Sequence, residues 1–470
     1  MADVPDFRST TVEALAASVR SGERSARSLT DTALDRIEAG NVELNAFVAI
    51  DAEAAQRQAA AIDERLAAGE DVGPLAGIPI GVKDLEDAAG FRTTRGAKHL
   101  KDSAVLDRDA TEVARLRAAG CVVIGKTNTP ESGWIGDTYN PVFGVTKSPW
   151  DLTRSPGGSS GGTSAAVAGG LVPLGTGSDG GGSIRIPSSV CGMSGFKPSQ
   201  GRIPHGPAPH GAADLSTVGP MARRIRDVAL ALDVVVGPNP NDLRSLPHPG
   251  ASFRSICDDP RPPARVLWCP SIEGSELDAE VLAVTTEAVD RIRSAGVEVV
   301  EAAPIVPEVF SAFLLLFYGG MVPGYRDVID GAAFAGVTPR LQEILTMADG
   351  LLSPESIEEA RKTAQRSSIA LAEAMEGFDC LLSPTTVGQT PRSERGGLVN
   401  GQESDGWVGN TYPLNVTRRP AGTTNAGFAA DGMPVGLQIV GHQLDDIRAV
   451  ELTAWVEDLL GFDPVAPFGP

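Results

Sequence analysis

The feature that most constrains the fold of this chain is a repeated alternation of short apolar runs with amphipathic segments. From residue 75, the run "GIPIGVK" is followed by the helical pattern "DATEVARLRAAG" and then by the apolar run "CVVIGK". The same order recurs in "RVLWCP", "DAEVLAVTTEAVDRIRSAG" and "VEVVEAA". This alternation is typical of βαβ units, whose helices cover both faces of a sheet. The sequence therefore predicts an α/β fold around a twisted, mixed and mostly parallel β-sheet.

The remaining segments are expected to extend this sheet and its helices. Residues 1–70 are rich in strong helix formers and predict N-terminal helices, whereas residues 75–235 contain the densest strand and turn patterns. Residues 305–375 predict a variable helical subregion near the substrate entrance, and residues 405–470 return to the core. Because no internal repeat is present, we expect one domain over residues 1–470.

Charge and cysteine content exclude several classes of protein. The net charge of −20 argues against a nucleic acid or an anionic membrane surface as partner, because both attract basic proteins. No stretch reaches 18 consecutive apolar residues, and the N-terminus lacks the pattern of a signal peptide. The five cysteines are scattered and contain no C-x-x-C pair, which favours a reducing compartment. We therefore expect a cytoplasmic protein without a metal site.

A Gly/Ser-rich stretch from Ser155 to Ser188 contains two short motifs that lack their structural context. "GTGSDG" matches the dinucleotide-binding pattern G-x-G-x-x-G, but Pro187 interrupts the next segment and no acidic residue follows within the usual distance. "GGSSG" matches the nucleophile elbow G-x-S-x-G at Ser159, but "SPWDLTRSP" before it is not a strand. Neither motif explains the stretch.

A third interpretation uses two serines of the stretch together. Ser159 and Ser183 lie in separate Gly-rich loops that flank "SAAVAGGLVPLG", which predicts a short helix leading into a buried strand. Such a connection can bring the two loops side by side. The backbone N–H groups of Gly180, Gly181, Gly182 and Ser183 would then form a nest that binds an oxyanion.

A serine hydroxyl needs a base, and Lys83 at the end of "GIPIGVK" is the best candidate. Acting as a base near pH 7 requires that burial lower its pKa by about 3 units from the ordinary value. The alternative is a lysine that reaches solvent from the end of a strand.

These segments resemble the amidase signature family, whose members are hydrolases that use two serines and a lysine. The agreement is dense from about residue 75 to 235 and resumes after about residue 405. The matching strings are "GIPIGVKD", "GKTNTPE", "SPWDLTRSPGGSSGG", "GSDGGGSIRIPSSVCG", "GFKPSQGR", "LSTVGPMAR" and "GMPVGLQIVG". The resemblance implies the amidase signature fold and amide hydrolysis without a metal or cofactor.

The resemblance also assigns roles to individual residues. Lys83 matches the general base, Ser159 matches the bridging serine that follows a cis peptide bond, and Ser183 matches the acylated nucleophile. Asp179 and Arg185 match a pair that we expect to brace the loop. Two positions depart from the family pattern, because many members have Thr in place of Gly180 and Asn in place of Leu85.

The substrate is less constrained than the reaction. The segment "ESGWIGDTYNPVFG" lines the acyl side of the site in this family, so Trp134, Ile135 and Tyr139 are either pocket residues or loop packing. The helical run with Phe313, Leu314, Phe317 and Tyr318 forms either an apolar mouth or part of the core.

We expect a small-molecule amide-type substrate, most simply an uncharged, moderately large amide or anilide, together with water. Aryl esters and carbamates are extensions, because both react through similar tetrahedral intermediates. The expected state is a monomer or homodimer. The alternative is the glutaminase component of a tRNA-dependent amidotransferase, which would require a partner chain.

Overall fold

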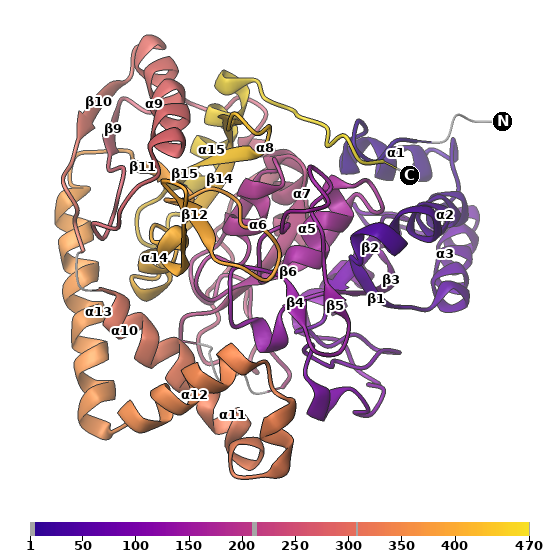
Figure 1. Ribbon diagram of the computed structural model, residues 1–470. Helices are drawn as coiled ribbons and strands as arrows, with labels where there is room; N and C mark the ends of the chain where they lie inside the picture. The colour runs from indigo at the N-terminus through magenta and orange to yellow at the C-terminus, as the bar shows by residue number, and fades with distance from the viewer. Residues whose placement is uncertain (1–4, 209–213, 307–308, 470) are drawn as a thin grey trace.

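The computed structural model describes residues 5–208, 214–306 and 309–469 and is built on one 11-stranded sheet (Figure 1). The strand order is β1-β3-β2-β6-β8-β7-β14-β15-β11-β9-β10. These strands are β1 (Phe47–Ile50), β2 (Pro79–Lys83), β3 (Val122–Thr127), β6 (Leu174–Asp179), β7 (Gly195–Lys197), β8 (Thr217–Ala222), β9 (Arg265–Trp268), β10 (Glu298–Glu301), β11 (Cys380–Pro384), β14 (Ala421–Phe428) and β15 (Pro434–Val440). Two small sheets pair β4 (Tyr139–Asn140) with β5 (Gly144–Val145) and β12 (Gly397–Val399) with β13 (Gln402–Ser404).

The sheet is mixed, as the sequence predicts. Strands β3, β2 and β6 form one parallel run, and β11, β9 and β10 form a second. Antiparallel pairs join these runs through β8, β7, β14 and β15, and β1 adds an antiparallel edge. Because β2 and β6 are parallel neighbours, their last residues, Lys83 and Asp179, lie at the same edge of the sheet.

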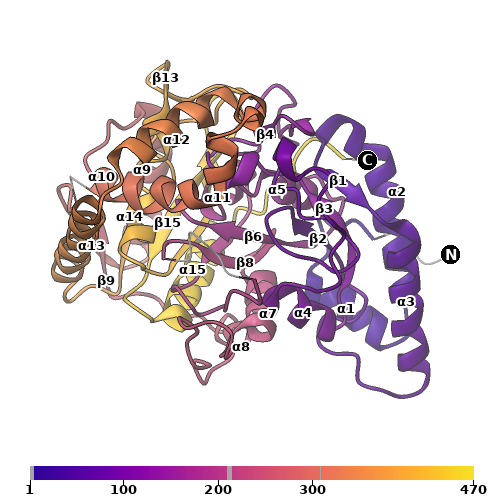
Figure 2. The same ribbon diagram turned by 90° about the horizontal axis from the view of Figure 1, so that it is seen from below.

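Helices flank the sheet and extend to both ends of the molecule. Figure 1 shows α1, α2 and α3 at one end and α10 to α13 toward the other, and Figure 2 shows α7 and α8 on the opposite side of the sheet from α11 and α12. The helices are α1 (Val12–Arg20), α2 (Ala26–Leu44), α3 (Ala52–Ala67), α4 (Thr111–Ala118), α5 (Gly161–Ala168), α6 (Arg185–Val190), α7 (Ile225–Val235), α8 (Phe253–Ile256), α9 (Ala279–Ser294), α10 (Val309–Phe313), α11 (Gly319–Ile329), α12 (Pro339–Leu351), α13 (Pro354–Ala374), α14 (Tyr412–Val416) and α15 (Asp446–Leu460).

The local sequence explains where several helices begin. Thr11, Ser25, Asp51 and Asp278 are N-cap residues whose side chains accept backbone N–H groups of α1, α2, α3 and α9. Helix α13 begins with a capping box at Ser353. These residues satisfy donors that the first turn of a helix leaves unpaired.

Helix α5 packs closely on β6 because the strand presents glycine to it. A methyl group at Gly175 would lie 2.7 Å from Cγ2 of Thr163 in α5, so a larger residue would push the helix away. The close packing matters because α5 begins directly after Ser159 and Ser160.

The N-terminal segment contains one strand where the sequence predicts helices only. Asn45 caps the C-terminal end of α2 with a left-handed backbone, and Asn41 Oδ1 accepts the N–H groups of Ala46 and Phe47. These contacts release the chain into β1, which pairs with β3.

Within the described ranges, no helix combines the length and hydropathy that spanning a bilayer requires.

Candidate active site

The two Gly-rich loops lie against each other at the edge of the sheet where β2 and β6 end. The N–H group of Ser160 donates to the carbonyl of Ser183 at 3.3 Å, which joins the loop before α5 to the loop after β6. Lys83, the last residue of β2, enters the same region. The structure therefore brings together the segments that carry Lys83, Ser159 and Ser183, which are far apart in the sequence.

Lys83 contacts three serine hydroxyls. Its Nζ lies 2.9 Å from Oγ of Ser159, 2.8 Å from Oγ of Ser160 and 3.0 Å from Oγ of Ser178. The peptide bond between Gly158 and Ser159 is cis, as the family resemblance implies. Ser160 and Ser178 were not predicted as partners of the lysine, although Ser160 is the second serine of the pair in "GGSSGG".

The lysine is fully buried, which excludes the alternative of a side chain that reaches solvent. Burial lowers the pKa of Lys83 to about 7, while the negative charges of Glu86 and Asp179 oppose this shift. An amine with such a pKa is partly neutral at pH 7 and can therefore accept a proton. The environment thus supplies the lowered pKa that a lysine base needs near neutral pH.

Exposure increases from the lysine to the candidate nucleophile. Lys83 is 0% exposed, Ser159 is 2% exposed and Ser183 is 8% exposed. Ser183 and Gly181 line a cavity of about 610 Å³, and Gly133 lines another part of it. A methyl group at Gly133 would lie 3.1 Å from Oγ of Ser159, so this serine lies just behind the wall of the cavity.

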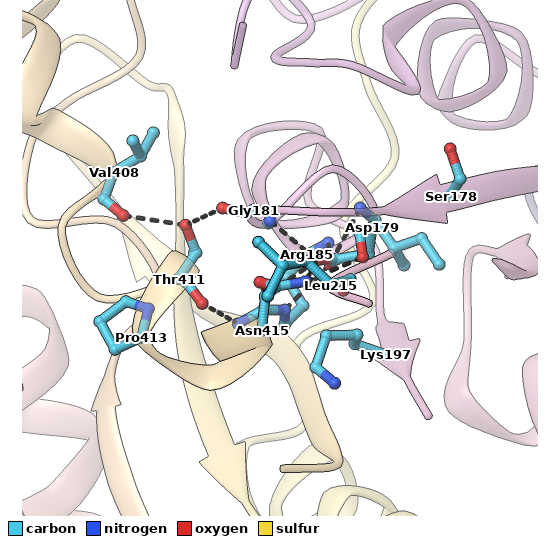
Figure 3. Close-up of polar contacts among 12 residues, drawn as sticks. Ser178, Asp179, Gly181, Arg185, Lys197, Leu215, Val408, Thr411, Pro413 and Asn415 are labelled. Atoms are coloured by element: carbon cyan, nitrogen blue, oxygen red, sulfur yellow. Dashed lines mark hydrogen bonds and ion pairs between the residues drawn. The ribbon is translucent and has the colours of Figure 1, made fainter. Parts of the chain in front are cut away.

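The peptide unit between Gly181 and Gly182 is held at both ends (Figure 3). The Gly182 N–H donates to Oδ1 of Asp179 at 2.8 Å, and the Gly181 oxygen lies 2.7 Å from Oγ1 of Thr411. The same hydroxyl lies 2.8 Å from the oxygen of Val408, so its single proton is shared between two carbonyls.

This geometry distinguishes among the four expected oxyanion donors. The N–H group of Gly182 already donates to Asp179 and is not available to a substrate. In the part of the chain that the structure describes, the N–H groups of Gly180, Gly181 and Ser183 have no acceptor. The candidate donors are therefore these three amides.

Asp179 and Arg185 form a fully buried ion pair behind the loop. Nε and Nη2 of Arg185 donate to the carboxylate at 3.0 and 2.9 Å, and Nδ2 of Asn415 donates at 2.9 Å. Burial alone would raise the pKa of Asp179, but Arg185 holds it well below its usual value. Arg185 Nη1 also donates to the oxygen of Thr411 at 2.9 Å, so the pair ties the loop to the start of α14.

Most of the expected pocket residues line the cavity. Trp134 and Ile135 do so, and the apolar helical run contributes Phe313, Leu314, Phe317 and Tyr318. Tyr139 does not line the cavity, because its ring packs edge-on against Trp134 with the centroids 6.5 Å apart. Of the two alternatives for Tyr139, this position favours loop packing.

The arrangement contains the groups that acyl transfer needs. It presents a hydroxyl at a cavity, a buried amine behind it and backbone amides that have no other acceptor. Among residues 5–208, 214–306 and 309–469, no group of three or more His, Cys, Asp or Glu side chains is placed to hold a metal ion.

Comparisons with known proteins identify similar chains over almost the whole sequence. The chain is 37% identical over 467 residues to an acylamidase from Rhodococcus erythropolis, and the match covers 97% of this chain and 95% of the relative. It is also 37% identical over 453 residues to one of the subunits of a glutamyl-tRNA(Gln) amidotransferase from Roseiflexus sp. (strain RS-1), with 90% of this chain and 91% of the relative covered.

Solved structures also include similar proteins. A bacterial aryl acylamidase of the amidase signature family superposes with a TM-score of 0.89 at 28% identity, covering 96% of each chain. The family model described as Amidase matches residues 28–450. The protein with this buried lysine and its two serine loops therefore belongs to the amidase signature family of hydrolases.

Proposed function

We propose that this protein hydrolyses uncharged amides or anilides through an acyl-enzyme on Ser183, with Ser159 as proton relay and Lys83 as general base. The observation that carries the proposal is the 2.9 Å contact between Nζ of Lys83 and Oγ of Ser159 in a fully buried environment. A lysine with a pKa lowered to about 7 suits general base catalysis near neutral pH.

The first half of the reaction forms the acyl-enzyme. Neutral Lys83 accepts the proton of Ser159, Ser159 accepts the proton of Ser183, and Oγ of Ser183 attacks the substrate carbonyl carbon. The carbonyl oxygen becomes an oxyanion that accepts hydrogen bonds from the N–H groups of Gly180, Gly181 and Ser183. The tetrahedral intermediate then collapses, the C–N bond breaks, and the proton returns through Ser159 to the leaving nitrogen.

The second half regenerates the enzyme. Water gives a proton to the relay and attacks the Ser183 ester, and the acid product leaves as Ser183 regains its proton. Asp179 and Arg185 contact no substrate in this scheme. They hold the oxyanion loop (residues 180–183) from behind, a role that their buried contacts with Gly182 and Thr411 support.

The lining of the cavity supports an apolar substrate. Its walls include the aromatic and aliphatic side chains of Trp134, Ile135, Phe313, Leu314 and Phe317. Two of the similar proteins are named acylamidase and aryl acylamidase. Aryl esters and carbamates remain proposed as additional substrates, in a cytoplasmic monomer or homodimer that needs no cofactor.

The second candidate function is the glutaminase component of an amidotransferase, which the 37% identity to a chain of such an enzyme favours. A hydrolysis panel of primary amides, anilides, carbamates, aryl esters and glutamine, with Ser183→Ala as blank, separates the two. We expect turnover of anilides or amides by the wild type alone. Strict preference for glutamine would support the second candidate, and turnover by Ser183→Ala would contradict the acyl-enzyme.

A further inference from the structure

Two glycines of the oxyanion loop are covered by aromatic rings from the helical subregion. A methyl group at Gly180 would lie 2.6 Å from Cε2 of Phe317, and one at Gly181 would lie 2.7 Å from Cζ of Phe313. Both distances are shorter than van der Waals contact, so each ring occupies the space that a side chain would fill. The two rings reach the loop because positions 180 and 181 lack side chains.

These rings belong to a stack that lies along the loop. The centroids of Phe317 and Phe313 are 5.1 Å apart with 12° between the planes, and those of Phe313 and Tyr412 are 4.8 Å apart with 23° between the planes. We call Phe317, Phe313 and Tyr412 the aromatic stack. All three line the cavity that contains Ser183.

The local backbone explains why two of these rings face the same way. Phe313 ends α10, and a π-helical turn over Leu314–Tyr318 joins it to α11. Residues four apart lie on one face of a helix, and π-turns inside helices are frequent at functional sites. Phe313 and Phe317 therefore project together toward the loop.

Contacts at both ends hold the stack in place. Oη of Tyr318, whose ring packs edge-on against Phe313 and Phe317, donates to the oxygen of Trp134 at 3.1 Å. Oη of Tyr412 donates to the carboxylate of Glu273. The stack is a positioned wall, because its neighbours limit the rotation of its rings.

We propose that the aromatic stack selects the acyl part of the substrate and favours a flat aryl group attached to the scissile carbonyl. The inference rests on the proposed acyl-enzyme, because it places the acyl group beside the amides of Gly180 and Gly181. An aryl ring there contacts the stack at the offset or edge-on distances that aromatic pairs prefer. The charged α-amino and α-carboxylate groups of glutamine would lose hydration against this wall.

The test compares two p-nitroanilides with acyl groups of similar size, benzoyl and cyclohexanecarbonyl, of which only the first is flat. Phe317→Leu keeps an apolar side chain but removes the ring. We expect the ratio of kcat/KM for the benzoyl substrate to that for the cyclohexanecarbonyl substrate to fall by about two- to tenfold, in line with aromatic pair energies. Phe334→Leu is the matched control, because Phe334 belongs to the same helical subregion but is not among the residues that line the cavity, and its ratio should stay at the wild-type value.

A second measurement tests the contact between Gly180 and Phe317. Gly180→Ala should lower kcat/KM for the benzoyl substrate in the wild-type background, because its methyl group displaces the ring. In the Phe317→Ala background the same change should have little effect, since the space is free. Equal effects of Gly180→Ala in both backgrounds would contradict a direct contact between Gly180 and Phe317. If Gly180→Ala does not fold, the substrate ratio measured with Phe317→Leu still tests the role of the stack.

The outcomes separate this inference from the proposed function. An unchanged substrate ratio in Phe317→Leu, together with an inactive Ser183→Ala variant, would overturn the role of the stack and leave the acyl-enzyme intact. Turnover of the benzoyl substrate by Ser183→Ala would overturn the acyl-enzyme itself.

Discussion

Replacement of Lys83 by Met should inactivate the enzyme and make its relative stability depend on pH. The pKa of Lys83 is lowered from 10.5 to about 7 in the folded protein. At about 1.36 kcal/mol per pKa unit, keeping this lysine buried at pH 7 costs about 4 kcal/mol of the free energy of unfolding. Met removes that cost and also the contacts with three hydroxyls, worth about 1 kcal/mol each. Because these two contributions oppose each other at pH 7, the change of relative stability with pH is the quantity that reports on the lysine.

The sign of the pH dependence follows from proton binding. Between pH 7 and 10.5 the unfolded wild-type chain keeps the lysine proton that the folded protein has lost, so wild-type stability rises with pH. Lys83→Met lacks this linkage. The stability of the wild type relative to the variant should therefore increase by about 2 kcal/mol between pH 7 and pH 9.

The assay is urea unfolding of both proteins at the two pH values, with the free energies of unfolding compared at each. Lys197→Met is the matched control, because burial also lowers the pKa of Lys197 to about 7 while its Nζ donates to the oxygen of Pro198 at 3.0 Å. The stability of the wild type relative to Lys197→Met should increase with pH in the same way as it does relative to Lys83→Met. Unlike Lys83→Met, Lys197→Met should still hydrolyse amides. If the difference in free energy of unfolding between the wild type and Lys83→Met does not change with pH, the lowered pKa of Lys83 is refuted.

Three further predictions concern the relay, the loop and the charge near the lysine. Ser159→Ala should lower kcat by about 10²- to 10⁴-fold, because the proton path between Ser183 and Lys83 is broken. Thr411→Val should lower kcat by up to about tenfold with little change in KM, and Thr411→Ser should restore it, since the hydroxyl holds the Gly181 carbonyl. The acid limb of the wild-type kcat/KM profile should lie near pH 7, where Lys83 loses its proton, and Glu86→Gln should move it to lower pH because the carboxylate raises that pKa.

Each of these variants has an outcome that contradicts the assignment. Wild-type kcat in Ser159→Ala would remove the relay from the mechanism. A rise in KM with unchanged kcat in Thr411→Val would mean that this residue affects substrate binding rather than the oxyanion loop. Loss of the acid limb in Glu86→Gln would identify Glu86 as the titrating group, because burial raises its pKa to about 7 as well.

The strands with apolar patterns were predictable from the sequence, and the strands rich in Gly and Thr were not. "GIPIGVK", "CVVIGK" and "RVLWCP" correspond to β2, β3 and β9, because short β-branched runs are typical of buried strands. Strand β14 has the sequence "AGTTNAGF", which shows neither apolar alternation nor β-branched apolar residues, although almost all of it is buried. Its strand structure depends on pairing with β7 and β15.

The side chains of the candidate site divide in the same way. Lys83, Ser159 and Ser183 were predicted because two Gly-rich loops and a lysine at the end of a strand indicate them and the family resemblance covers their segments. Thr411 and Asn415 contact the oxyanion loop from more than 200 residues further along the chain, and no local pattern reveals such a contact. The engagement of the Gly182 amide by Asp179 also requires three-dimensional geometry, since a glycine run alone does not tell which amides are free.

The central claim is that Ser183 carries the acyl group, and trapping the intermediate tests it most directly. A p-nitrophenyl benzoate reaction is quenched in acid within the first turnover, and the modified peptide is located by mass spectrometry. We predict a benzoyl group on Ser183 in the wild type and none there in Lys83→Met. A benzoyl group on Ser159 in its place, or a burst of p-nitrophenol without any acylated peptide, would contradict the account.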